Sequence, residues 1–184
     1  MEVATVVMAE SFEFEVVFAL PPGAHDAAAL ADAVFAAGFR DAVVGTGNKR
    51  LLAVELEAQG ADAEAAILAV ARAILPRLPA GSALREVRPD LVSLAEVAAK
   101  LDVSRQTLQQ REMPPPVAGG LYRIDEVAAA LERAAAPGEG RRRPRFAPDA
   151  ARRWFRAGSG ARSVNARLAL GTLDPRSLHG RPGR

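Results

Sequence analysis

The most constraining feature of the sequence is a pair of helix start signals at Ser93 and Ser104. Ser93 is followed three residues later by Glu96, a capping box in which each residue accepts a hydrogen bond from the backbone N–H of the other. Residues 94–101 carry apolar side chains at i, i+3, i+4 and i+7, one face of a helix. Asp102 tolerates the left-handed conformation of a tight turn. The sequence therefore predicts two short helices joined by a tight turn.

The second predicted helix, residues 105–112, has a polar outer face. Leu108 is its only large apolar residue and is expected to point inward. Gln106 and Gln110 are expected nearly opposite Leu108, flanked by Arg105, Thr107 and Gln109. Glutamine and arginine side chains can pair with the edges of adenine and guanine. Two helices across so tight a turn form the helix-turn-helix unit, whose second helix enters the DNA major groove. An ordinary solvated surface helix would present the same polar face.

The residues that follow extend this pattern. Three prolines at 114–116 are expected to stop the second helix, because proline has no backbone N–H. Residues 119–120 are a Gly-Gly turn, and residues 121–123 are a short extended piece. Asp125 is expected to cap a third helix. Helix, turn, helix, short hairpin and helix together predict a winged helix-turn-helix.

Ser-Leu-Ala-Glu-Val-Ala-Ala-Lys-Leu-Asp-Val-Ser-Arg-Gln-Thr-Leu (93–108) and Leu-Tyr-Arg-Ile-Asp-Glu-Val-Ala-Ala-Ala-Leu (121–131) resemble the DNA-binding module of MerR-type regulators and phage excisionases. The resemblance implies that the helix from Ser104 meets the major groove and that Arg123, in the wing, meets a phosphate. Asp102 stands where the family usually has Gly, and no long dimerisation helix follows Leu131. The candidate DNA-binding residues are Ser104, Arg105, Gln106, Thr107, Gln109, Gln110 and Arg123.

The first half of the chain predicts a separate α+β domain. Apolar residues alternate with Glu in residues 12–18, as in a half-buried strand. The expected elements are strand 12–20, helix 25–38, strands 42–44 and 51–57, helix 62–75 and strand 83–88. The order βαββαβ predicts a ferredoxin-like sandwich with its helices on one sheet face. The layout of residues 12–131 also resembles small bacterial DNA-binding proteins that join such a domain to this helix-turn-helix. The predicted domains are 1–90, 91–136 and an Arg-rich tail, 137–184.

Four glutamates are expected to gather on the uncovered face of this sheet. Glu13 and Glu15 belong to the first strand, and Glu55 and Glu57 to the third, which is its neighbour in ferredoxin-like topology. Like charges on adjacent strands repel one another mildly. The face is either simply solvated or a docking surface for something basic.

Charge is distributed unevenly along the chain. Residues 141–184 hold 12 Arg and 2 acidic residues, a net charge of +10, whereas residues 1–140 hold 12 basic and 20 acidic residues, a net of −8. Such asymmetry indicates a nucleic-acid-binding tail or an internal electrostatic contact. Because apolar residues are few after Ala136, the tail is expected to be disordered or to fold only on a partner, with short helices at 148–155 and 161–170 separated by Gly158-Ser-Gly160. It could hold phosphates, wrap a partner protein or be a neutral extension.

The sequence shows no catalytic, cofactor or metal constellation. Cysteine is absent, and His25 and His179 each stand alone. The loop at 45–49 has two glycines and joins two predicted strands, so it is a hairpin turn and not a phosphate-binding loop. The first residues lack the basic start of a signal peptide, and no apolar run approaches the length of a membrane helix. We expect a cytoplasmic protein that is not an enzyme and does not bind membranes.

These patterns support two functional hypotheses. The first is a bacterial transcriptional regulator that binds double-stranded DNA with the helix from Ser104. Without a coiled coil, a homodimer would form through residues 11–88. The alternative is a protein-interaction module, such as an antitoxin, whose N-terminal domain or basic tail binds a partner protein.

Overall fold

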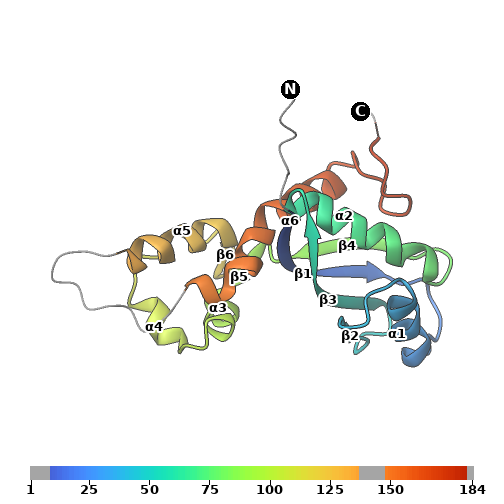
Figure 1. Ribbon diagram of the computed structural model, residues 1–184, viewed down its shortest axis with the longest axis horizontal. Helices are drawn as coiled ribbons and strands as arrows, with labels where there is room; N and C mark the ends of the chain where they lie inside the picture. The colour runs from blue at the N-terminus through green and yellow to red at the C-terminus, as the bar shows by residue number, and fades with distance from the viewer. Residues whose placement is uncertain (1–8, 137–147, 182–184) are drawn as a thin grey trace, which may run out of the picture.

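An antiparallel sheet and a group of short helices occupy opposite ends of the molecule (Figure 1). The structure, a computed structural model, describes residues 9–136 and 148–181. The strands are β1 (Glu10–Ala19), β2 (Val43–Gly45), β3 (Leu51–Gly60), β4 (Ala83–Arg88), β5 (Leu91–Ser93) and β6 (Leu121–Arg123). The α-helices are α1 (Ala27–Ala36), α2 (Ala63–Ile74), α3 (Leu94–Lys100), α4 (Arg105–Gln109), α5 (Ile124–Ala135) and α6 (Arg152–Ala169). Short 3-10 segments, η1 (Leu75–Arg77) and η2 (Pro148–Ala151), complete the described elements.

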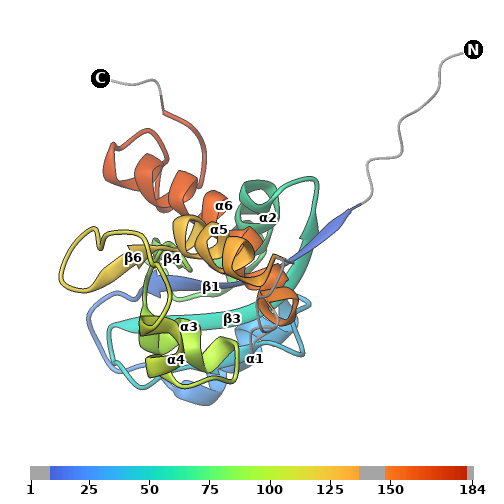
Figure 2. The ribbon, with the colours of Figure 1, turned by 90° about the vertical axis from the view of Figure 1, so that its left-hand side faces the viewer.

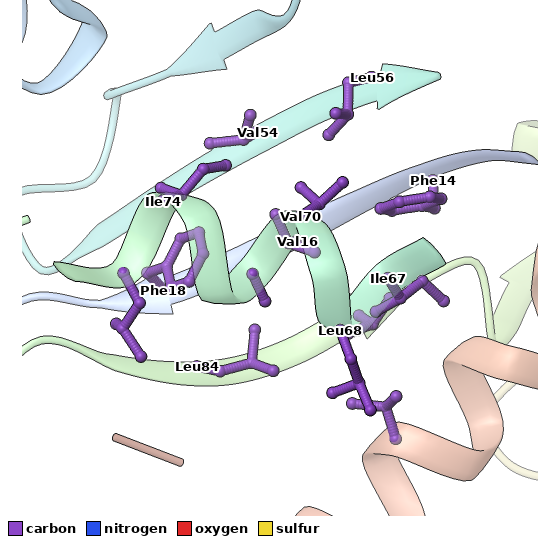
Figure 3. Close-up of a cluster of buried hydrophobic side chains, with 14 of the residues drawn as sticks. Phe14, Val16, Phe18, Val54, Leu56, Ile67, Leu68, Val70, Ile74 and Leu84 are labelled. Atoms are coloured by element: carbon purple, nitrogen blue, oxygen red, sulfur yellow. The ribbon is translucent and has the colours of Figure 1, made fainter. Parts of the chain in front are cut away.

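The four-stranded sheet has the order β2-β3-β1-β4, and every neighbouring pair is antiparallel. The apolar residues that alternate along the central strand β1 are buried on one face, beneath α2. Figure 3 shows this core, with Phe14, Val16, Phe18, Val54, Leu56 and Leu84 of the sheet and Ile67, Leu68, Val70 and Ile74 of α2. The predicted α+β class is confirmed. We call residues 9–88 the sheet domain.

The two helices of the sheet domain begin at aspartates. The carboxylate of Asp26 accepts hydrogen bonds from the first turn of α1, and Asp62 Oδ1 accepts one from Ala65 N at 2.8 Å. The buried residues of α1 itself are Leu30 and Val34, whereas Phe35 is 37% exposed.

Residues 91–136, which we call the helical module, pack around a second core that is separate from the core of the sheet domain. Helices α3, α4 and α5 enclose it together with the β5–β6 pair (Figure 2). Val97, Leu108 and Leu131 are fully buried at its centre. The apolar periodicity of residues 94–101 therefore faces inward as predicted.

The expectation of a disordered tail is wrong for residues 148–181, while residues 137–147 and 182–184 lie outside the described residues. Residues 152–169 form one helix, α6, which runs from the helical module to the sheet domain (Figure 1). Trp154 and Phe155 pack in the core of the module, whereas Ala161 and Val164 pack in the core of the sheet domain. The tail needs no core of its own because its few apolar residues are shared between two existing cores.

Gly158 and Gly160 were expected to separate two helices, but both lie inside α6. A Cβ built on Gly158 would lie 2.1 Å from Cγ2 of Ile124, and one built on Gly160 would lie 2.5 Å from the backbone nitrogen of Glu64. A side chain at either position would force the neighbouring atoms to move. These glycines therefore bring α6 close to its neighbours and do not break the helix.

The segment around and after α6 also covers the outer edge of β4. The side-chain amide of Asn165 accepts from Val87 N and donates to Val87 O, both at 2.8 Å, as a neighbouring strand would. The carbonyl of Pro175 accepts from Leu84 N at 2.8 Å. Leu173 and Leu178 are fully buried against the sheet domain. Residues of the same chain thus cover the outer edge of β4, with which another strand could otherwise pair.

Candidate nucleic-acid interface

The turn between α3 and α4 is built as the sequence predicts. Ser93 Oγ accepts from Glu96 N at 3.2 Å, and Glu96 Oε2 accepts from Ser93 N at 2.7 Å, which completes the capping box. Asp102 has φ of +52°. Val103 N donates to Ala98 O at 3.0 Å, as in a Schellman motif. Asp at 102 thus takes the left-handed position that Gly most often fills.

Helix α4 presents a polar face to solvent. Ser104 caps it by accepting from Thr107 N at 3.2 Å, and the two hydroxyls lie 2.9 Å apart. Leu108 is fully buried, as expected from its position. The side chains of Arg105, Gln106, Gln109 and Gln110 are exposed. Ser104 and Thr107 are therefore engaged in capping, and the four longer side chains are available to a ligand.

Two details of the predicted module differ. α4 ends at Gln109 and not at residue 112, with Gln110 as its C-cap residue. The expected hairpin between α4 and α5 is reduced to a single bridge, between Ala118 and Leu121. Strand β6 pairs instead with β5, which precedes α3.

Asp125 does not cap α5, although the sequence suggested it. Arg123 stands at the N-cap position and makes no capping hydrogen bond through its side chain. The carboxylate of Asp125 pairs with Arg162 of α6 instead. Arg123 itself is half-buried in β6, opposite Leu91.

A polar groove of about 520 Å³ lies between α4, the start of α3 and the turn before β6. It brings together two of the predicted contact residues, Arg105 and Gln109. The other predicted residues do not line it. Sequence reasoning missed Arg111 and Tyr122, which line it from beyond α4 and from β6. The full lining is Ser93, Leu94, Ala95, Arg105, Gln109, Arg111, Met113, Gly119, Gly120, Leu121 and Tyr122.

The four glutamates share one sheet face, as expected. Glu13 lies opposite Glu57, and Glu15 lies opposite Glu55. This face is not simply solvated, because Lys100 of the helical module reaches it. Lys100 Nζ donates to Glu13 and, at 2.9 Å, to Glu55 Oε1. The face docks a basic group that belongs to the same chain.

The environment of Lys100 favours its charge. Burial alone would lower the pKa of Lys100, but hydrogen bonds to Glu13 and Glu55 outweigh it, and the pKa is raised above its usual value. The ammonium also lies 5.8 Å from the ring centroid of Trp154 in α6, within cation–π range. One cation thus joins the sheet, α3 and α6.

The described part of the tail neutralises carboxylates of the same molecule. Arg153 pairs with Glu57 at 2.8 Å and Arg156 with Glu10 at 3.2 Å. Further ion pairs join Arg162 to Asp90 and Asp125, Arg167 to Glu64, Arg152 to Asp149, and Arg181 to Asp174. Of the alternatives raised by the charge asymmetry, these residues favour an internal electrostatic contact.

The two glutamates at opposite ends of the acidic face have different environments. Burial raises the pKa of Glu15, although Arg88 beside it acts in the opposite direction. A hydrogen bond from Ser11 and the ion pair with Arg153 lower the pKa of Glu57. The pKa of each of these two glutamates therefore depends on the groups that surround it and not only on the strand to which it belongs.

No protein-family model, curated protein or solved structure matches the chain. Across residues 9–136 and 148–181, no group of three or more His, Asp or Glu side chains is arranged to hold a metal ion. Within the same ranges, no helix is long and apolar enough to cross a bilayer.

Proposed function

We propose that the protein binds double-stranded DNA in a sequence-specific manner and acts as a transcriptional regulator. The supporting observation is the combination of one buried side chain with four exposed ones on α4 and its C-cap residue Gln110. Leu108 anchors the helix, and the guanidinium of Arg105 and three glutamine amides point away from the core. These groups can form paired hydrogen bonds with base edges in a major groove.

The short length of α4 limits what it can read. Five helical residues present few side chains to a groove, and contacts of a recognition helix concentrate at its N-terminal end. Arg105 and Gln106 occupy that end. The adjoining groove, with Arg105, Arg111 and Tyr122 in its lining, would accept the sugar-phosphate backbone beside the bases.

The architecture is consistent with this proposal. The element order βαββαβ and the strand order β2-β3-β1-β4 support a ferredoxin-like sheet domain, and α3, α4, α5 and the β5–β6 pair support a helix-turn-helix module with a reduced wing. We place Arg123 at the edge of this module as a phosphate contact. The basic tail, on which the protein-partner alternative partly rested, is largely paired with carboxylates of the same chain where it is described.

The proposal is tested by selecting bound sites from random duplex DNA and then replacing single side chains. Arg105→Ala and Gln106→Ala should each weaken binding to the selected site by about 1–3 kcal/mol, roughly 5-fold to 150-fold, because each removes a paired contact to a base. Both side chains are exposed, so the thermal unfolding temperature should not change.

Arg40→Ala and Gln59→Ala are matched controls, because they remove the same groups from exposed positions of the sheet domain. Their affinities should equal that of the parent. If selection enriches no sequence, or if the α4 variants bind like these controls, α4 does not read DNA.

A further inference from the structure

Two segments of the chain join the sheet domain to the helical module, and they pass each other at one place. The first runs from β4 into β5 through Pro89, and the second is α6. A Cβ built on Gly158 of α6 would lie only 3.7 Å from the carbonyl oxygen of Pro89. Two close connections define an axis about which one part can turn against the other.

The second connection contains the residues best suited to bending. Gly158-Ser159-Gly160 lies where α6 passes from the module to the sheet domain, with Gly158 against Ile124 of the module and Gly160 against the start of α2. Glycine and serine pairs are among the usual sites at which helices kink, since glycine has the least restricted backbone. Any turn of one part against the other would bend α6 within these three residues.

Away from this axis, a group of ion pairs joins the helical module to the sheet domain. Lys100, the last residue of α3, contacts Glu13 of β1 and lies 2.9 Å from Glu55 of β3. The three side chains are between 30% and 43% exposed, so water and salt reach them. Arg153, next to Trp154 on the same side, adds a pair to Glu57.

We propose that Lys100 and the glutamates Glu13 and Glu55 form a salt-sensitive latch across a hinge at Pro89 and Gly158. Closed, the latch holds the helical module in one orientation against the acidic sheet face. Open, it leaves the module attached through α6 and free to turn about the hinge. The inference goes beyond the proposed function and does not depend on DNA binding.

The physical basis is the different response of the two contacts to ions. The apolar packing of α6 does not weaken with salt, whereas the attraction between partly exposed charges does. The Debye length falls from about 10 Å at 0.1 M to about 3 Å at 1 M salt, so the attraction within the latch weakens over that range. Replacement of Lys100 by a neutral or acidic side chain should have the same result at low salt.

The full-length chain suits a direct measurement, because it contains no cysteine. Asp32→Cys on α1 and Glu132→Cys on α5 place two spin labels at exposed positions in the two parts. Pulsed electron-electron resonance then reports the distribution of distances between them. We expect one narrow peak at 50 mM salt and the loss of that peak at 1 M.

In the labelled chain, Lys100→Glu should abolish the narrow peak at low salt, and the charge exchange Lys100→Glu with Glu55→Lys should restore it. Lys49→Glu makes the same charge change at the other lysine of the chain, which is exposed before β3, and should leave the peak unchanged. Lys100→Gln, which avoids repulsion, should give a broad distribution at every salt concentration.

A narrow, salt-independent peak in the parent or in Lys100→Gln would overturn the proposal, because the packing of α6 would then hold the orientation alone. Fluorescence of Trp154, the single tryptophan, shows whether each variant is folded. If Lys100→Glu does not fold, Lys100→Gln and the salt series of the parent decide the question in either direction.

Discussion

The sheet domain and the helical module both use the tail to complete their cores, but they depend on it differently. In the described residues, the tail supplies five of the 26 buried residues of the sheet-domain core. It supplies three of the eleven in the module core, and these include its two buried aromatic residues, Trp154 and Phe155. The ring centroids of that pair lie 5.4 Å apart in a tilted arrangement.

This difference follows from the lengths of the elements. β1 and β3 are ten residues each, and α2 is twelve, so the sheet domain buries a continuous apolar layer from its own sequence. α3 and α4 have seven and five residues, lengths at which isolated helices are unstable in water. The module therefore obtains from α6 the apolar surface that its own helices are too short to provide. Helices as short as α3 and α4 can stay folded when another part of the chain completes their core.

Removal of the chain after Ala136 should have the largest effect and tests whether the two parts depend differently on the tail. The module should then lose its folded structure, because truncation of a large buried aromatic residue alone costs about 3–5 kcal/mol and two are removed. The sheet domain should be weakened but retain its central strands. Amide hydrogen exchange should show protection lost throughout α3, α4 and α5 and partly kept in β1 and β3.

A second variant separates the two contributions. Trp154→Ala with Phe155→Ala, in the full-length chain, removes only the module-facing side chains of α6. It should reproduce the loss of protection in α3–α5 and spare the sheet. Protected amides in α3–α5 of the truncated protein would show that the module folds without the tail.

A smaller effect should come from the two glycines of α6. Alanine normally stabilises a helix by about 1 kcal/mol relative to glycine. Gly160→Ala should instead destabilise the protein by about 1–3 kcal/mol, because its methyl group would meet the backbone of α2. Gly158→Ala should cost less, since it meets the side chain of Ile124, which can shift more readily than backbone.

Urea unfolding measured by circular dichroism and by Trp154 fluorescence compares these variants. Ser159→Ala is the control, because this exposed position lies between the two glycines. Its stability should equal or exceed that of the parent. If Gly160→Ala were as stable as Ser159→Ala, the close packing of α6 on the sheet domain would be wrong.

The smallest expected effects distinguish two carboxylates on the same sheet face. The pKa of Glu15 is raised, so its contribution to stability is present below its usual pKa and is lost as the pH rises through the folded value. The pKa of Glu57 is lowered, so its contribution is present above its usual pKa and is lost as the pH falls through the folded value. The two groups should respond to pH in opposite directions.

Accordingly, Glu15→Gln should gain stability relative to the parent between pH 4 and pH 7, and Glu57→Gln should lose stability over the same interval. Each change should be below about 1 kcal/mol, as for other partly exposed charges. Urea unfolding of the three proteins at both pH values measures it. Changes of the same sign in both variants would contradict the assignment of distinct environments.

Much of the local structure could be predicted from the sequence because local interactions determine it. The capping box of Ser93 and Glu96, the left-handed turn at Asp102 and the burial of Leu108 all follow from residues within one or two helical turns. The alternation of residues 12–18 predicted β1 and its acidic face equally well. Errors at this level, such as the cap assigned to Asp125, arose where a residue made a distant contact instead.

What the sequence by itself determined is therefore the set of elements, their inward faces and the polar face of α4. The tertiary structure alone decided what the tail does, why Gly158 and Gly160 occur in a helix, and which cation meets the acidic strand face. Each of these depends on pairs of residues far apart in the chain, such as Lys100 with Glu13 and Gly160 with Ala63. A pattern confined to one segment records that a residue is small, charged or apolar. Only the folded chain shows which surface that residue meets, because such contacts form when distant segments pack together.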